Sequence, residues 1–518
     1  MLSFAVSGPS QPVVHQPQGS VPGAGTGARS VRRAYLIGKE DLPVPGAVGV
    51  DAASGGIVCR KSFNGAAALG LQVDCAAAGL LTLRTCLLPD RDKPYLLDLE
   101  LARRRIMLLL NKIEEWGWSD LAADDPVMVG LNKARELFTR ALISKTPAGS
   151  AGFSAEQAAS AKESLVTALE AGELLAVRDG QRRLAERLKG SDKPQVGVSV
   201  HSDVFAEPLQ KVVAGSVDFV SMPMRWSKIE PEEGRFDFSK KDRWIEWAIR
   251  SAKLPVAAGP VIDFSPRGCP AWLGVWNHDY ETLREFAYEH AKRVITRYRR
   301  TVSRWTVCGG LNINNGFSLS VEQMVDLTRV AVLAVRKLHP GAPVFVEITE
   351  PFGEHASANS QSVAPLLYAE LVLGSGVQTD GFALRVQMGD RQGGRSTRDL
   401  LELSSMLDTY AEFDKPMHIT AMGCPSGSTN GSGGEEPGHW RTPWSPEAQA
   451  AWMDHAMLVA LSKPLVKSVC WQALYDTPDG PEMPLGGLVS ADGRAKPALK
   501  RLAEIRAGLR GGKLPTDR

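Results

Sequence analysis

From residue 195 onward, short apolar stretches alternate with helical patterns, and this alternation limits the possible folds more than any other feature of the chain. The stretches are QVGVSVHS (195–202), VDFVSMPMRW (217–226), LPVAAGPVIDFS (254–265), SRWTVCGG (303–310), PVFVEITE (343–350), DGFALRVQMG (380–389), PMHITAMG (416–423) and VKSVCWQAL (466–474). Several are apolar on both faces, as parallel strands covered by helices must be. Eight strand–helix units predict an α/β fold, a (β/α)8 TIM barrel over residues 195–508.

The first 190 residues have a different pattern. Residues 1–92 are rich in glycine and carry short β-type runs, which predict a small antiparallel β domain. It could be a β-sandwich of the carbohydrate-binding kind or a domain that only packs against its neighbour. Residues 93–190 have helical periodicity and predict a helical segment, and residues 509–518 form a short tail.

Composition excludes several classes of partner. Lys and Arg total 60 against 58 Asp and Glu, so no net field recruits nucleic acid or an anionic membrane. No apolar run approaches the roughly 20 residues of a membrane helix. The seven cysteines include no Cys-x-x-Cys pair, which indicates reduced thiols and a cytoplasmic protein. The histidines lack metal-site spacing, so we expect neither a metal nor another cofactor.

Two long motifs make the barrel more specific. MRWSKIEPEEGRFDFSKKDRWIEWA (224–248) follows the second predicted strand, and SVCWQALYDTPDG (468–480) with PLGGLVSADGRAKPALKRL (484–502) closes the eighth. Both resemble glycoside hydrolase family 10, the xylanase family. The resemblance implies retaining hydrolysis of β-1,4-linked xylan by two carboxylates about 5–5.5 Å apart, one an acid and the other a nucleophile.

At the two positions where the resemblance implies catalytic carboxylates, this sequence has residues without a carboxyl group. The acid, at the end of the fourth strand, falls on Gly310, and the nucleophile, in the seventh strand, falls on Ala421. Further departures fall on places where the family contacts sugar; they are Ser221, Met222, Gly259, Asp263, Arg385 and Gln387. Because function resides in the site and not in the fold, we predict a retained barrel with a degenerate or altered site.

Two carboxylates outside the family's places are candidates for relocated chemistry. Asp263 follows the third strand and Glu350 ends the fifth. We expect both to face the barrel mouth and to flank a void left by Gly309 and Gly310. Each has a structural alternative as an ion-pair partner of a nearby arginine.

Other polar residues of the strands and loops have two interpretations each. Glu347, inside the fifth strand, is expected to pair with Arg385 on the sixth. Trp440 and Trp444 follow the seventh strand, and they would either stack on pyranose rings or anchor their loop. The predicted glycan-binding residues are Arg225, Asp263, Asn312, Glu350, Gln387 and Trp471.

Three functions remain open at this stage. The leading prediction is a family-10-like barrel that binds or acts on an oligo- or polysaccharide without the standard retaining xylanase mechanism. The first alternative is an active O-glycosyl hydrolase with relocated carboxylates. The second is an intracellular structural or interaction protein that uses the barrel as a scaffold.

Overall fold

The computed structural model describes residues 1–6, 14–15, 30–31, 33–51, 53–144, 152–265, 268–390, 394–428, 437–477 and 483–513. The chain divides into two compact units. Unit 1 comprises residues 1–179, 389–404 and 431–443, and unit 2 comprises residues 180–388, 405–430 and 444–518.

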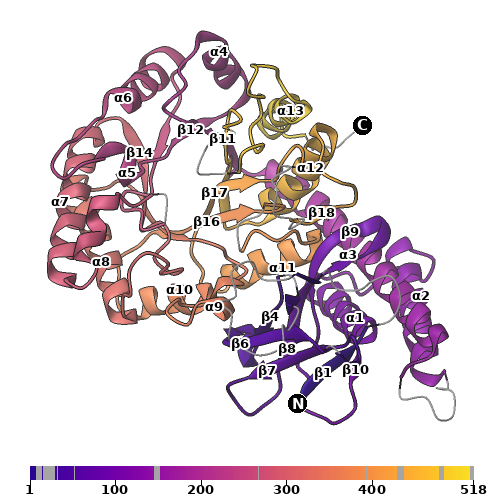
Figure 1. Ribbon diagram of the computed structural model, residues 1–518. Coiled ribbons are helices and arrows are strands. Elements are labelled where there is room, and N and C mark those ends of the chain that lie inside the picture. Colours follow the sequence, from indigo (N-terminus) through magenta and orange to yellow (C-terminus); the bar gives the residue numbers. More distant parts are fainter. Residues whose placement is uncertain are drawn as a thin grey trace. The chain divides into compact units, whose positions relative to one another are not determined.

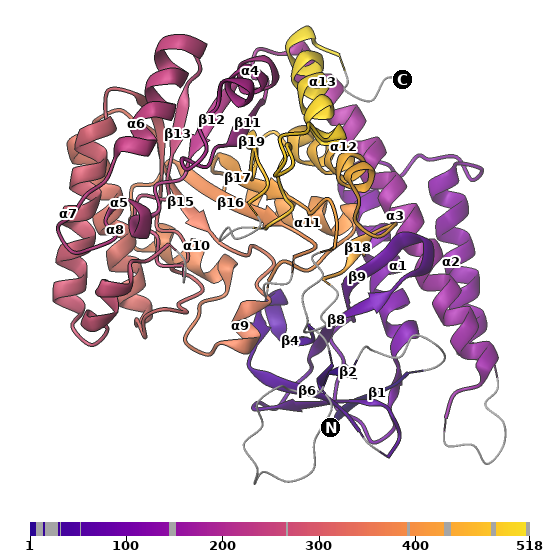
Figure 2. The ribbon, with the colours of Figure 1, turned by 45° about the horizontal axis from the view of Figure 1, so that its top comes forward.

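In unit 2 the described residues form a closed barrel of eight parallel strands (Figures 1 and 2). In barrel order the strands are β11 (Gln195–Ser199), β12 (Phe219–Met222), β13 (Val256–Ala258), β14 (Val302–Val307), β15 (Val344–Ile348), β16 (Gly381–Gln387), β17 (Met417–Gly423) and β19 (Val466–Trp471). Each strand coincides with one of the eight apolar stretches, so the predicted (β/α)8 barrel is confirmed.

Helices follow the barrel strands and cover their outer faces (Figure 1). They are α4 (Glu207–Ser216), α5 (Trp226–Ile229), α6 (Ser239–Glu246), α7 (Tyr280–Tyr298), α8 (Val321–Leu338), α9 (His355–Ala358), α10 (Pro365–Gly374), α11 (Leu400–Ala411), α12 (Pro446–Ser462) and α13 (Pro497–Gly511). Local sequence fixes their starts: Ser320 and Gln323 form a capping box at α8, and Ser445 caps α12 with Pro446 in its first turn.

Unit 1 contains the predicted β-rich region as two sheets. The six-stranded sheet has the order β10 (Tyr95–Leu96), β1 (Leu2–Ala5), β7 (Ile57–Lys61), β6 (Gly46–Val50), β3 (Ser30–Val31) and β2 (Val14–His15). The five-stranded sheet has the order β18 (His439–Trp440), β9 (Gly79–Arg84), β8 (Ala68–Asp74), β4 (Tyr35–Ile37) and β5 (Pro43–Val44).

The helical segment shares a core with these sheets. Its helices are α1 (Leu97–Glu115), α2 (Pro126–Ile143) and α3 (Ala155–Lys189). One hydrophobic cluster joins Phe4 and Leu69 of the two sheets to Leu101 of α1 and Leu165 of α3. The described parts of residues 1–179 therefore belong to the same compact unit.

Two segments from between barrel strands also belong to unit 1. Residues 389–404 bring Asp399, which forms a buried ion pair with Arg105 of α1. Residues 431–443 bring β18, which pairs antiparallel with β9. Trp440 on β18 is 2% exposed and donates its indole N–H to Glu173. This contact matches the anchoring interpretation of Trp440.

Two further features bear on the expectations from composition. None of the helices that the structure describes is both long and apolar enough to cross a membrane. The seven cysteines, which all lie in described ranges, are unpaired.

Candidate functional site

A cavity with about 680 Å³ of empty space, open mouth included, lies inside the barrel of unit 2. Its lining comes from all eight strands or from the residues directly after them. On several strands the lining residues are two positions apart: Ser199 and His201, Phe219 and Ser221, Arg304 and Thr306, Ser468 and Cys470. Alternate side chains of a strand face the same side, so these residues point into the barrel.

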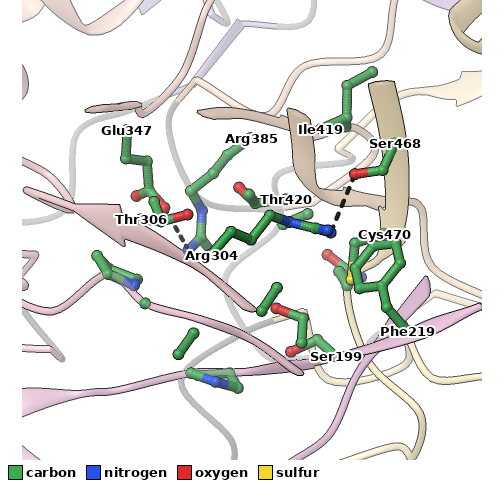
Figure 3. Close-up of a pocket in the computed structure, with 18 of the residues that line it drawn as sticks. Ser199, Phe219, Arg304, Thr306, Glu347, Arg385, Ile419, Thr420, Ser468 and Cys470 are labelled. Carbon is green, nitrogen blue, oxygen red and sulfur yellow. Dashed lines mark hydrogen bonds and ion pairs between the residues drawn. The ribbon is translucent and has the colours of Figure 1, made fainter. Parts of the chain in front are cut away.

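The barrel interior is unusually polar. Branched apolar side chains fill the interior of most TIM barrels. Here the inward positions carry hydroxyl, guanidinium and carboxylate groups, and Figure 3 shows several of them projecting into the same space. A polar interior that water can enter is suited to a ligand with many hydroxyl groups.

Glu347 of β15 and Arg385 of β16 face each other in this interior (Figure 3). Their closest charged atoms, Oε2 and Nη1, are 3.9 Å apart, which confirms the expected pair. The hydroxyl of Thr349 donates to Oε1 of Glu347 over 3.1 Å. The Glu347 side chain is only 3% exposed, so these contacts compensate for its burial.

Arg304 of β14 extends across the barrel toward β19 (Figure 3). Its Nη2 donates to the hydroxyl of Ser468 over 3.3 Å, and its guanidinium lies 4.1 Å from the ring centre of Phe219. In the part of the chain that the structure describes, no carboxylate lies within ion-pair distance of it. Desolvation lowers the pKa of Arg304 to about 10.

His418 of β17 completes a short hydrogen-bonded chain with these groups. Its Nδ1 lies 2.7 Å from the Ser468 hydroxyl. Because that hydroxyl accepts from Arg304, its own proton is left to donate to Nδ1 of a neutral imidazole. Burial lowers the pKa of His418 well below its usual value, and the positive charges of Arg304 and Lys467 act in the same direction.

Asp263 lines the cavity but is held by its own loop. It is 6% exposed, and its Oδ1 accepts the backbone N–H of Ser265 over 3.0 Å. It also forms a parallel β-bridge with Gly309, which extends β13 and β14 past their ends. Desolvation raises the pKa of Asp263, while hydrogen bonds from Ser265 oppose that rise.

The expected void beside Gly309 and Gly310 is absent, and that prediction was wrong. A β-carbon on Gly309 would lie 2.5 Å from Cγ of Pro260, and one on Gly310 would lie 2.8 Å from the backbone nitrogen of Ser265. Gly310 also has a φ of +72°, which disfavours any side chain. The loop after β13 therefore occupies the space that the sequence alone left open.

The other predicted site residues fall into two groups. Arg225 and Ala421 line the cavity with Asp263. Gln387 is outside the lining, but its amide donates to Gln472, which is part of it.

The remaining three predicted residues make contacts elsewhere in the barrel. Glu350 has a φ of +52° and its Oε2 lies 3.2 Å from Nδ1 of His355. Asn312 is fully buried and donates to the carbonyl of Thr349 over 2.8 Å. Trp471 is fully buried and donates to the carbonyl of Gly486. None of the three is among the described residues that line the cavity, so the structure does not bring Glu350 to the lining beside Asp263.

Sequence reasoning missed several lining residues, chiefly Arg304, Thr306, Thr420, Ser468 and Gln472. A signal for most of them exists, since polar residues recur at every second position of β14, β17 and β19. Polar residues at a spacing of two in otherwise apolar parallel strands indicate a polar barrel interior.

The cavity offers little support for thiol or metal chemistry. Burial raises the pKa of Cys470 to about 12, so its thiol stays protonated at neutral pH. Within the described ranges, no group of three or more His, Cys, Asp or Glu side chains is arranged to hold a metal ion.

The fold is a glycoside-hydrolase-like (β/α)8 barrel. Residues 188–320, which contain β11 to β14, match the family model "Glycosyl hydrolase family 10". The resemblance predicted from the sequence motifs is therefore confirmed for this part of the barrel.

Individual relatives are distant. The chain is 25% identical over 224 residues to endo-1,4-beta-xylanase 2 of Aureobasidium pullulans, covering 41% of this chain and 61% of that protein. It is 24% identical over 131 residues to endo-1,4-beta-xylanase B of Humicola insolens, covering 25% and 36%. Both matches span less than two thirds of the relative's length. Among solved structures, xylanase 10B from Thermotoga petrophila RKU-1, in complex with xylobiose, is 17% identical with a TM-score of 0.44, covering 62% of this chain and 97% of that chain.

Proposed function

We propose that the barrel of unit 2 binds an oligo- or polysaccharide in its central cavity and does not hydrolyse it by the retaining double-displacement mechanism. The observation that carries this proposal is the backbone at Gly310, the place that the family resemblance assigns to the acid. Its positive φ and its closeness to Ser265 leave no room for a glutamate there. The family match supports a carbohydrate ligand.

The second catalytic place supports the same conclusion. Ala421 lines the cavity, but a methyl group can neither attack an anomeric carbon nor stabilise a cation. Without a nucleophile, even a substrate with an excellent leaving group gains no covalent route. A retained cavity without both carboxylates is more consistent with recognition than with turnover.

A second candidate function is hydrolysis by a different carboxylate pair. Among the described residues, Asp263 and Glu347 are the carboxylates in the cavity lining. The raised pKa of Asp263 is the property that a general acid needs. Against this, Asp263 is engaged by Ser265 and Glu347 by Thr349 and Arg385.

One experiment separates the two functions and the scaffold alternative. The full chain is titrated calorimetrically with xylotetraose and with other β-1,4-linked tetraoses, and the products are analysed by chromatography. Saturable binding with intact oligosaccharide supports the proposal. Cleavage that Glu347→Gln or Asp263→Asn abolishes, and that Glu246→Gln on an exposed helix face leaves unchanged, supports the second function. Neither binding nor cleavage of any β-1,4 glycan would leave the barrel as a scaffold.

We also propose a cytoplasmic location. The seven unpaired cysteines support it, because thiols persist in a reducing compartment. Cell fractionation followed by detection of the full chain tests this location.

A further inference from the structure

Among the described residues that line the cavity of unit 2, arginines outnumber carboxylates. Arg225, Arg304 and Arg385 are in its lining, and each guanidinium is protonated at neutral pH. The carboxylates in the lining are Asp263 and Glu347. Even with both ionised, the described lining carries an excess of positive charge.

Both lining carboxylates are engaged by groups other than Arg304. The closest charged atoms of Glu347 and Arg385 are 3.9 Å apart, which is a loose pair, and Glu347 also accepts from Thr349. Asp263 is turned to the backbone N–H of Ser265, and desolvation favours its protonated form. Neither carboxylate lies within ion-pair distance of Arg304.

Arg304 is the most informative of the three arginines. Its partners are neutral, namely the hydroxyl of Ser468 and the ring of Phe219, and it remains partly accessible in the cavity. Enclosing a guanidinium without an anion costs free energy, which its lowered pKa also reflects. A ligand that brought a negative group into the cavity would recover this cost.

Arg304 and Arg385 both contribute a guanidinium to the cavity lining. They start from β14 and β16, and Figure 3 shows Arg304 directed to Ser468 and Arg385 directed toward Glu347. The planar fork of a guanidinium matches the two oxygens of a carboxylate or sulfate, and such charge-assisted bonds are about twice as strong as neutral ones. A neutral pentose offers only hydroxyl groups to the same donors.

We propose that the glycan recognised by this cavity is anionic, carrying a carboxylate or a sulfate ester on a sugar ring, and that Arg304 and Arg385 bind that group with Arg225 near the mouth. The inference rests on the proposed carbohydrate-binding function and specifies its ligand class. It assigns the cavity's specificity to charge instead of to a neutral xylose unit.

The test uses ligands that differ only at one carbon of each ring. Cellotetraose, its fully C6-oxidised tetraglucuronate and its 6-O-sulfated form are titrated into the full chain at pH 7 in low and moderate salt. We expect at least one anionic tetraose to bind on the order of tenfold more tightly than cellotetraose, with the advantage falling as salt rises. The preferred anionic form identifies the group as carboxylate or sulfate.

Variants connect the preference to the named residues. Arg385→Gln should remove most of the anionic advantage, measured as the ratio of the affinities for the anionic tetraose and for cellotetraose. Arg304→Gln should do the same, and Arg304→Lys, which keeps a charge, should retain part of it if Arg304→Gln does not fold. Arg250→Gln, at an exposed pair with Glu246 on the outer face, is the matched control and should change nothing.

The outcomes distinguish this inference from the proposed function. Equal or tighter binding of cellotetraose, unaffected by Arg385→Gln, would overturn the anionic inference while the carbohydrate-binding proposal stands. Failure of all three tetraoses and of xylotetraose to bind would overturn both. An anionic advantage that remains in Arg385→Gln and in both Arg304 variants would also contradict the inference, because other residues would then bind the anionic group of the ligand.

Discussion

A β-carbon on Gly310 would lie 2.8 Å from the backbone nitrogen of Ser265, in a loop that follows a different barrel strand. The two segments are locked by the bridge between Asp263 and Gly309, with hydrogen bonds of 2.8 Å from Phe264 to Gly309 and from Gly309 to Ile262. The place that the family resemblance assigns to a catalytic glutamate is therefore built as a close contact between backbones. Restoring the glutamate would require the loop to move.

The first prediction concerns this contact. Gly310→Ala should lower the free energy of unfolding by at least about 1–2 kcal/mol, because an L-residue is strained at positive φ. Steric overlap with Ser265 adds to this cost. Thermal unfolding measures the effect. Gly310→Glu should be destabilised at least as much as Gly310→Ala, and it should not gain xylanase activity.

The control for this prediction is Gly215→Ala. Gly215 lies in α4 without a positive φ, and a β-carbon added there would have no neighbour within 4 Å. Alanine favours helix by up to about 1 kcal/mol over glycine, so this variant should be neutral or more stable. If Gly310→Ala were as well tolerated as Gly215→Ala, the account of the Gly310 contact would be wrong.

The second prediction concerns Ala421. It pairs with Arg385 across β16 and β17 and lines the cavity, so Ala421→Glu would place a carboxylate among the arginines. We expect the affinity for an anionic tetraose to fall by on the order of tenfold, since the new charge competes for the same donors. Calorimetry measures the loss, and Ala421→Gln, of nearly equal size, is the control that should lose less.

The third prediction concerns pH. Burial holds the pKa of His418 in the folded chain well below its unfolded value of about 6.5, so the unfolded chain binds the extra proton first. The stability associated with neutral His418 is present above about pH 6.5 and is lost as pH falls, by up to about 1.4 kcal/mol per pH unit. The pKa of His290 is lowered by burial too and acts with the same sign.

Melting temperatures at pH 7.5 and pH 5.5 test this prediction. The wild-type chain should lose stability between the two values, and His418→Gln should lose less. Parallel losses in the two proteins would show that folding does not lower the pKa of His418, which would contradict the buried, neutral imidazole inferred from its contact with Ser468.

The fourth prediction concerns unit 1. Arg105 and Asp399 are both almost fully buried, and Arg105 also lies 3.4 Å from Glu402. Arg105→Met should destabilise unit 1 by about 3–5 kcal/mol, because it leaves the buried carboxylate of Asp399 without its cation. Arg140→Met removes an exposed pair with Glu136 and should cost about 0.5 kcal/mol or less. Equal losses measured by chemical denaturation would contradict the assigned role of Asp399.

The barrel was predictable because its strands are short apolar runs at regular spacing, and such periodicity is local information. The membership of residues 389–404 and 431–443 in unit 1 was not predictable from the sequence. It depends on pairs such as His439 with Leu80 and Arg105 with Asp399, whose members are hundreds of positions apart. No local pattern reports a contact at that separation.

The site was predictable to a similar degree. Arg225 and Asp263 reach the cavity as expected, whereas Trp471, the last residue of β19, lies between the lining residues Cys470 and Gln472 and donates to the carbonyl of Gly486 instead. A shift of one residue along a strand reverses the face of a side chain, so a strand assigned correctly can still give the wrong lining residue. Glu350 lies beyond β15 in a turn with positive φ, whose direction the sequence does not specify.

The most direct test of anionic-glycan binding without cleavage is a calorimetric titration of the full chain with the anionic tetraoses. The oligosaccharides in the calorimeter sample are then analysed by chromatography. The account predicts a saturable heat of binding, weakened by Arg385→Gln, and oligosaccharide recovered at its original length. Shortened products that disappear in Glu347→Gln would contradict it, as would the absence of any binding heat with the anionic and neutral glycans alike.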